Sequence, residues 1–356
     1  MGSVCGFLFR LFAVFLFVVD VGEVQTSTAA APKKSAIVID YTNGRHVLFA
    51  DHPDAKRYPA SITKVMTVYL LFEAIKKKHI TMNTEFRVSK LASQQIPSKL
   101  GVKVGQKMKV SDIIKALLVK SANDVAVVAA EGVAGSVAKF CKMMNKKGRQ
   151  LGMRNTHFAN PSGVPDTRQV SSARDLAKLG MAIFRDFPQY WHFFSEKKFV
   201  FGKNTHKTHC KILHWYKGAD GAKTGYICAS GFNLLVTANR YDKLGRARRI
   251  FTVVMGGKSA KERDLYAAQL MDKYLKGYTA SPQKQSLQKS KGKTAKQSLL
   301  EQVSKSEMLD KVVQEENEVL VTETASDFNA MLDELYRDNE EVVAEEEAVL
   351  VSPKKR

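Results

Sequence analysis

Strand-like segments at both ends of one long region enclose a mainly helical stretch, and this order restricts the fold more than any other feature. Ser35–Tyr41 and His46–Ala50 are rich in apolar residues, and Thr42-Asn43-Gly44 between them is a typical hairpin turn. Early and late strands can join in one antiparallel sheet, so we predict an α+β fold with helices on the sheet, a mainly helical lobe and a cleft between them. The late elements are expected at Gly221–Ile227, Phe232–Ala238, Arg249–Met255 and, as a closing helix, Lys261–Leu275.

The middle of the chain has helical periodicity. Apolar residues from Val65 to Phe72 recur every three to four positions, which predicts a helix from Ser61 to near Lys78. Further helices are expected at Ser111–Val119, Val125–Gly132, Ser136–Leu151 and Ser172–Phe184.

Three short polar motifs lie on this framework in a fixed order: Ser61-Ile62-Thr63-Lys64, Ser121-Ala122-Asn123 and Lys223-Thr224-Gly225. Ser61 is expected at a helix start, where free backbone N–H groups favour developing negative charge, and Lys64 lies one turn further on the same face. The second motif falls in a break between helices and the third on a strand. Together they provide the serine nucleophile, lysine base and polar side chains of an enzyme that acylates itself on a peptide-like carbonyl.

The combination of motifs carries this inference, because each part has an ordinary structural explanation. Ser-x-x-Lys occurs seven times in the chain, but only the copy at Ser61 lies in an expected helix and precedes the single Ser-x-Asn. Taken singly, Ser61 could cap a helix, Ser121 and Asn123 could belong to a loop, and Lys223 could be a surface lysine. Their joint order favours one active site.

Composition divides the rest of the chain. Residues 1–31 are expected to be a signal peptide, because Arg10 precedes the apolar run Leu11–Val19 and Ala29-Ala30-Ala31 offers a cleavage site. An uncleaved membrane anchor is the alternative, although the run is short for a span. The folded domain would then occupy residues 32–278, followed by a Lys/Ser/Gln-rich linker at 279–300 and an acidic tail at 301–356. We expect an exported protein.

The charge is unevenly distributed. Residues 32–278 hold 44 Lys and Arg against 17 Asp and Glu, a net charge of +27, whereas residues 301–351 carry a net charge of −13. A body this basic attracts polyanions, and without a nucleic-acid motif an anionic envelope surface or wall polymer fits better than nucleic acid. The tail is expected to be disordered apart from a short amphipathic helix with Phe328, Met331, Leu332 and Leu335 on one face. The opposed charges favour its docking on the basic body or on a basic partner.

No cofactor or metal is expected. His206, His209 and His214 stand near Cys210, but the segment lacks a second dense pair of ligands, so it is interpreted as a polar loop. Cys228, just beyond Gly225 at the expected cleft edge, is interpreted as a small core residue, with a thiol that modulates access as the alternative.

The segment Tyr58–Thr67 resembles the nucleophile motif of the D-alanyl-D-alanine carboxypeptidases, the low-molecular-weight penicillin-binding proteins of the bacterial envelope. Ser121–Asp124 and Asp220–Gly225 are similar to the other two motifs of that family, and Asn160–Gly163 and Val254–Gly257 to further segments. The resemblance covers about residues 35–276. It implies a β-lactamase/DD-peptidase-like fold, a peptidoglycan pentapeptide substrate and inhibition by β-lactams.

The resemblance also implies a role for each position. Ser61 would attack the carbonyl between two D-alanines, Lys64 would take its proton, and Ser121 would relay a proton to the leaving amine. The oxyanion hole would be formed by the N–H groups of Ser61 and Tyr226. The remaining substrate-binding positions are Asn123 for the substrate backbone, Lys223 for positive charge beside Ser121, Thr224 for the terminal carboxylate, Gly225 for close approach of the substrate, and Arg263, which resembles an arginine that supports carboxylate binding in some members.

Neighbouring functions use the same motifs. Fast β-lactam hydrolysis is not expected, because Glu131 and Glu196 are the only glutamates between the second and third motifs, and neither has the position of a deacylating glutamate. Penicillin should therefore acylate Ser61 and remain there. A DD-endopeptidase that cuts wall crosslinks is one alternative, and a wall-binding structural factor with incidental activity is another. The tail departs from the family pattern, because its negative charge does not suit binding to an anionic bilayer.

Overall fold

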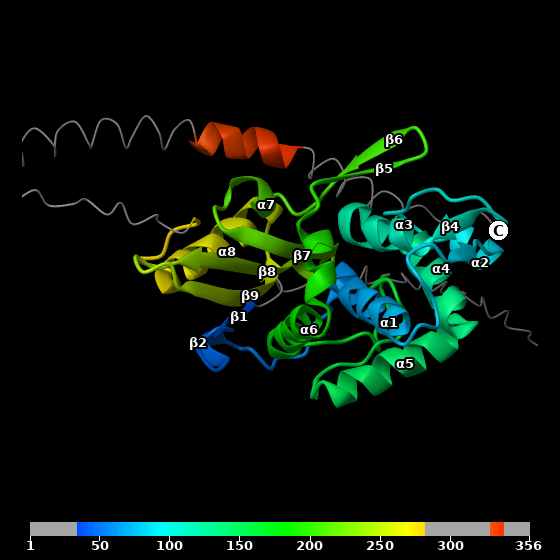
Figure 1. The fold of residues 1–356 in the computed structure, drawn as a ribbon, viewed down its shortest axis with the longest axis horizontal. Coiled ribbons are helices and arrows are strands. Elements are labelled where there is room, and N and C mark those ends of the chain that lie inside the picture. The colour runs from blue at the N-terminus through cyan, green and yellow to red at the C-terminus, as the bar shows by residue number, and fades with distance from the viewer. Residues whose placement is uncertain (1–33, 282–327, 338–356) are drawn as a thin grey trace, which may run out of the picture. The chain divides into compact units, whose positions relative to one another are not determined.

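The central element of the fold is a five-stranded antiparallel sheet with the strand order β2-β1-β9-β8-β7 (Figure 1). The computed structural model describes residues 34–281 and 328–337. Because β1 pairs with β9, the early and late strands form one sheet, as predicted. Strand β7, which carries Lys223-Thr224-Gly225, lies at the edge of the sheet. The strands are β1 (Ser35–Asp40), β2 (His46–Asp51), β7 (Ala219–Ile227), β8 (Gly231–Tyr241) and β9 (Ala247–Gly257).

Helices cover both faces of this sheet. Successive side chains of a strand point to opposite faces, and apolar side chains lie on both faces. Helix α8 (Ala260–Tyr274) and the short α7 (Ile212–Trp215) pack on one face, against side chains such as Val236 and Val254. Helix α6 (Ala173–Asp186) packs on the other face, against Leu235 and Phe251 among others, and joins it to the helical lobe. The remaining helices are α1 (Lys64–Lys76), α2 (Lys90–Ser93), α3 (Val110–Lys115), α4 (Asn123–Ala134) and α5 (Val137–Gln150).

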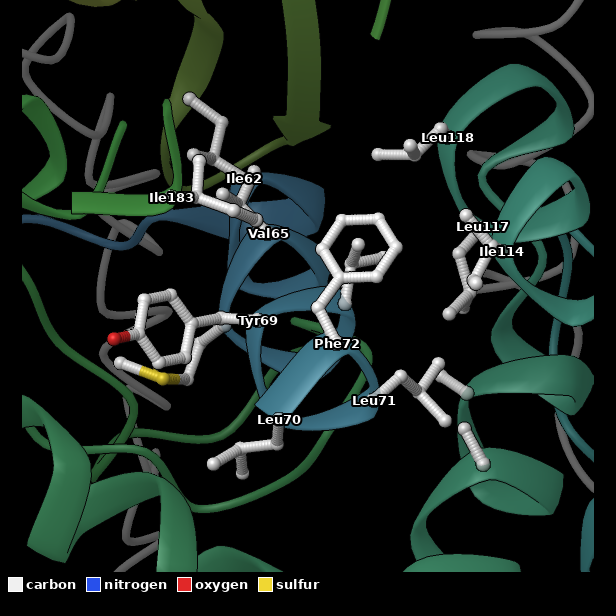
Figure 2. Packing of buried hydrophobic residues seen from close by; sticks show 14 of the residues in the cluster. Ile62, Val65, Tyr69, Leu70, Leu71, Phe72, Ile114, Leu117, Leu118 and Ile183 are labelled. Atoms are coloured by element: carbon white, nitrogen blue, oxygen red, sulfur yellow. The ribbon is translucent and has the colours of Figure 1, made fainter. Parts of the chain in front are cut away.

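Helix α1 is the central element of the helical lobe. Every side chain from Val65 to Phe72 is buried, so α1 packs against neighbouring elements on all its sides. Figure 2 shows Val65 near Ile183 of α6 and Leu71 and Phe72 directed toward the helical segment that carries Leu117. This burial fixes the first turn of α1 and the residues that precede it.

Several local predictions need correction. Ser61 lies in a 3₁₀ turn, η1 (Ala60–Thr63), and α1 begins only at Lys64. The predicted helix at Ser111–Val119 is α3 followed by a π-helical turn, η2 (Ala116–Lys120). Short elements escaped prediction because they hold too few residues for a period to be visible. These elements are β3 (Glu85–Arg87) paired with β4 (Lys107–Lys109), β5 (Lys198–Phe201) paired with β6 (Asn204–Lys207), and the 3₁₀ segment η3 (Pro188–Ser195).

The expected signal peptide, most of the linker and most of the acidic tail lie outside the described residues. At the linker's expected start, Thr279 still pairs with Tyr241, so the folded part continues slightly further than residue 278. Within 34–281 and 328–337, no helix has the length and apolarity needed to cross a membrane. Residues 328–337 form a helix that carries a buried Leu332, whereas Met331, expected on the same face, is largely exposed.

Candidate active site

Ser61 is held in the tight η1 turn just before α1. Ala60 has a φ of 46°, in the left-handed region, and the Ile62 N–H donates to the Pro59 carbonyl at 3.2 Å. Gly163 packs against this turn, since a Cβ at that position would lie 1.9 Å from the Ala60 carbonyl oxygen. Only glycine therefore allows the loop to approach. Ser61 is partly exposed, whereas its neighbours on both sides are buried, so substrate can reach it from solvent.

Lys64 connects Ser61 to the other motifs. Its Nζ lies 2.8 Å from Ser61 Oγ, 2.8 Å from Asn123 Oδ1 and 2.7 Å from the Ser162 carbonyl oxygen. The side chain has no solvent exposure, so these contacts fix its position. A neutral Lys64 in this position could accept the Ser61 proton directly.

Ser121 and Lys223 form a second polar pair. Lys223 Nζ donates to Ser121 Oγ at 3.0 Å and to the Thr224 carbonyl at 2.8 Å, and both side chains are buried. Ser121 follows η2 and has a φ of 61°, a left-handed conformation that is strained for a residue other than glycine. Such strain is common where a side chain must point to a particular place at a functional site.

Strand β7 passes very close to the nucleophile. A Cβ at Gly225 would lie 2.9 Å from the Ser61 backbone nitrogen and 2.9 Å from the Pro59 carbonyl oxygen. The absence of a side chain therefore lets the Lys-Thr-Gly strand and the η1 turn meet. Tyr226 follows, partly exposed, with its ring tilted against Phe232 at a centroid distance of 4.3 Å. Cys228 is exposed, so its interpretation as a core residue was wrong, and its Sγ lies 3.9 Å from the Tyr226 hydroxyl.

Asn123 holds Lys64 and the loop that follows α2 in place. Its Oδ1 accepts from Lys64, while its Nδ2 donates to the carbonyls of Ile96 and Pro97 at 3.1 and 3.0 Å. Both amide hydrogens are thus engaged by the protein itself. The contact of Asn123 with the substrate backbone stays a prediction, and these hydrogen bonds add a positioning role toward Lys64.

Two positioning groups were missed by the sequence analysis. The Ser162 carbonyl accepts from Lys64, and Asn160 fixes this loop by accepting the N–H of Gly163 at 2.7 Å. Buried Asn233 on β8 donates to the Tyr58 carbonyl at 3.0 Å and accepts the Gly256 N–H at 3.0 Å. The Asn160–Gly163 segment, noted above as similar to a family segment, could have pointed to the Ser162 carbonyl and Asn160. No sequence signal marked Asn233, because a lone Asn in a strand has no pattern of its own.

Arg263 belongs to α8, which packs on the sheet face opposite α6. It sits in the first turn of α8 with only 2% exposure, and its Nε donates to Asp264 Oδ1 at 2.7 Å. Its Nη1 donates to the Asn233 carbonyl at 3.3 Å, and Nη2 is buried with no hydrogen-bond partner among the described residues. Burial alone would lower the pKa of this guanidinium, but the Asp264 carboxylate raises it overall.

Positive charge converges on the site from several elements. Desolvation, followed by the charges of Lys223, Lys120 and others, lowers the pKa of His209 from 6.5 to about 3. The imidazole is therefore neutral at physiological pH. A site with this potential favours an anionic ligand such as a carboxylate.

We expect the depressed pKa of His209 to make stability depend on pH. Between pH 6.5 and about 3 the unfolded chain binds a proton at His209 that the folded chain does not, so the free energy of unfolding falls as pH falls through this window. His209→Asn should flatten the fall in melting temperature between about pH 7 and pH 4. His79→Asn, at an exposed histidine, is the control. Equal pH dependence in wild type and His209→Asn would contradict the assignment.

A serine in hydrogen-bond contact with a buried lysine, beside a strand at the edge of a sheet, is the arrangement found in the serine acyl-enzymes that penicillin inhibits. The family model of the D-alanyl-D-alanine carboxypeptidases matches residues 22–259. The chain belongs to this family of serine-type carboxypeptidases.

Individual relatives agree with this membership. D-alanyl-D-alanine carboxypeptidase DacA of Haemophilus influenzae is 33% identical over 272 residues, which cover 74% of this chain and 68% of the relative. The crystal structure of penicillin binding protein 5 from Haemophilus influenzae superposes with a TM-score of 0.63 at 33% identity, covering 67% of this chain and 69% of that one. The ampicillin-bound penicillin-binding protein D2 of Listeria monocytogenes gives a TM-score of 0.59 at 26% identity, covering 67% and 95%.

Proposed function

We propose that Ser61 is the nucleophile with which this carboxypeptidase removes the terminal D-alanine from peptidoglycan stem peptides. The observation that carries the assignment is the 2.8 Å contact between Ser61 Oγ and Lys64 Nζ. A neutral Lys64 takes the hydroxyl proton as Oγ attacks the carbonyl between the two D-alanines. Collapse of the tetrahedral intermediate breaks the C–N bond and leaves the peptide as an ester on Ser61. Water then hydrolyses this ester.

Proton delivery to the leaving amine falls to Ser121. Its hydroxyl accepts from Lys223 at 3.0 Å, so the positive charge of Lys223 makes Ser121 a better donor. The nitrogen of the departing D-alanine gains this proton as its bond to the carbonyl breaks, and the Ser121 oxygen takes back the proton that Lys64 accepted from Ser61, so Ser121 acts as a relay. Lys223 thus acts on the reaction through Ser121.

Substrate binding is proposed along the free edge of β7. An extended peptide there would place its scissile carbonyl toward the backbone N–H groups of Ser61 and Tyr226, which we assign as the oxyanion hole. Thr224, a residue with 7% exposure, is assigned to the terminal carboxylate. The closeness of Gly225 to the Ser61 nitrogen supports this arrangement, since it brings the two donors into one place.

The purified protein should form a stable adduct with benzylpenicillin on Ser61 and should release D-alanine from diacetyl-Lys-D-Ala-D-Ala. Mass spectrometry of the intact chain detects the adduct, and peptide mapping locates it. We expect the adduct to persist, because neither Glu131 nor Glu196 has the sequence position expected of a glutamate that activates a deacylating water.

Each other outcome of this assay has a distinct meaning. An adduct without D-alanine release would point to the endopeptidase or to a structural role in the wall. An adduct on any serine other than Ser61 would contradict the assigned nucleophile. No adduct at all would contradict the proposed chemistry.

Export to the periplasm or cell envelope is proposed from the apolar run Leu11–Val19 and from the basic body. The wall substrate of the proposed reaction lies outside the cytoplasmic membrane, and a net charge of +27 on residues 32–278 would hold the domain near anionic wall polymers. N-terminal sequencing of the protein from an envelope fraction tests the cleavage site, and a chain that retains Met1 in the cytosol would contradict export.

A further inference from the structure

Helix 328–337 from the acidic tail packs against residues of α7 and α8 in the body. Leu332 and Tyr336 are buried against Ala260, with Trp215 and Phe232 packed around them. An ion pair of 2.6 Å between Lys261 and Asp333 borders this contact. The charges agree with the contrast between the basic body and the acidic tail.

Tyr336 reaches into the body and meets a buried ion pair. Its hydroxyl donates to Asp264 Oδ2 and accepts from the indole Nε1 of Trp215 at 3.2 Å. The other oxygen of Asp264 accepts from Arg263 Nε at 2.7 Å. Asp264 is fully buried, so loss of the Tyr336 hydroxyl would leave one carboxylate oxygen short of a partner in a dry environment. Desolvation and the charge of Asp264 raise the pKa of Tyr336, which keeps the hydroxyl protonated as a donor.

Arg263 in turn contacts β8, the strand that pairs with the Lys-Thr-Gly strand β7. Its Nη1 donates to the carbonyl of Asn233, and Asn233 is the residue that pairs with Gly225 on β7. The Cys210 thiol, in the apolar cluster on the same face of the sheet as α8, lies 4.0 Å from Thr224 Oγ1. A change in the position of the guanidinium therefore alters both the potential and the packing behind the carboxylate-binding strand.

We propose that helix 328–337 is an intramolecular clamp for carboxylate recognition, in which Tyr336 positions Arg263 through Asp264. The tail is then part of the substrate-binding machinery, although it contacts no substrate. Tyr336 is a positioning residue, and its effect passes from tail to α8 and from α8 to β8 and β7. The proposal rests on the assignment of Thr224 and its strand to the carboxylate of substrate and inhibitor.

Tyr336→Phe tests the clamp because it removes the hydroxyl and keeps the ring in the apolar cluster. We expect the rate constant for acylation by benzylpenicillin to fall about two- to thirtyfold, the range of couplings carried through positioning residues. Acylation by the methyl ester of benzylpenicillin, which lacks the carboxylate, should be unchanged. For diacetyl-Lys-D-Ala-D-Ala the loss should appear mainly as a raised KM. Equal loss for the acid and the ester, or no loss for either, would overturn the proposal.

A matched pair on the tail helix tests docking itself. Leu332→Glu places a charge in the buried contact and should detach the helix, whereas Met331→Glu makes the same change on the exposed side, where Met331 is 44% exposed. Leu332→Glu should reproduce the selective loss of acid over ester, and Met331→Glu should behave as wild type. Identical behaviour of the two variants would overturn the clamp. If wild type is acylated yet releases no D-alanine, the carboxypeptidase assignment fails instead, and the acid-to-ester ratio still tests the clamp.

Discussion

Lys64→Met is expected to lower the rate of acylation of Ser61 by about 10³-fold or more, in line with the loss of a positioned general base. Methionine has a similar length and no basic nitrogen, so the buried space of Lys64 stays largely filled. The loss should appear equally with benzylpenicillin and with diacetyl-Lys-D-Ala-D-Ala, because both need the Ser61 proton removed. Mass spectrometry of the adduct over time measures the first rate, and D-alanine release measures the second.

The control for Lys64→Met must separate lost chemistry from lost structure. Three contacts of Lys64 disappear with the amine, and the Ser162 carbonyl and Asn123 Oδ1 lose a buried donor. Some loss of melting temperature is therefore expected. Lys147→Met removes a partly buried lysine of α5 that forms an ion pair with Glu73 of α1. This change should leave acylation unchanged. A Lys64→Met chain that is folded and acylated at the wild-type rate would exclude Lys64 as the base.

Gly225→Ala is expected to lower acylation by about 10²-fold or more, the effect of losing one oxyanion donor in related sites. The added Cβ would lie 2.9 Å from the Ser61 nitrogen and 3.0 Å from the Ile62 nitrogen, so β7 and the η1 turn must separate. Both proposed oxyanion donors, on Ser61 and Tyr226, lie beside this contact. The rate constant for acylation by benzylpenicillin is the direct measurement.

A glycine with room for a side chain provides the matched control. A Cβ at Gly148 on α5 would have its nearest neighbour at 3.6 Å, an ordinary contact with the Phe158 ring. Gly148→Ala should therefore leave acylation unchanged, and it should stabilise the helix slightly because alanine has the higher helix propensity. If Gly225→Ala and Gly148→Ala are equally active, the close approach of β7 to Ser61 has no catalytic importance.

The main features of the fold and site could be predicted because they depend on local patterns. The strand segments, the long α1 and the hairpin at Thr42-Asn43-Gly44 each follow from periodicity or turn chemistry within a few residues. The three motifs are equally local, and their order placed a serine and a lysine one helical turn apart. The 2.8 Å contact between Ser61 and Lys64 follows from that spacing.

Other features escaped prediction because they depend on distant segments. The π-helical turn η2 and the left-handed Ser121 have no periodic signal, and they are fixed by packing and by the contact with Lys223. The positioning contacts of Asn123 escaped prediction for the same reason, since its amide donates to the carbonyls of Ile96 and Pro97 in a distant loop.

By itself the sequence determined the order of the elements, the three catalytic motifs and the opposed charges of body and tail, because each is written in neighbouring residues. Only the tertiary structure decided how closely these parts meet. It brought Gly225 against the Ser61 nitrogen, and it joined Tyr336 to Arg263 through Asp264. The physical reason is that hydrogen bonds and steric limits act over about 3 Å. Contacts between residues far apart in the chain are therefore set by how the sheet and helices pack.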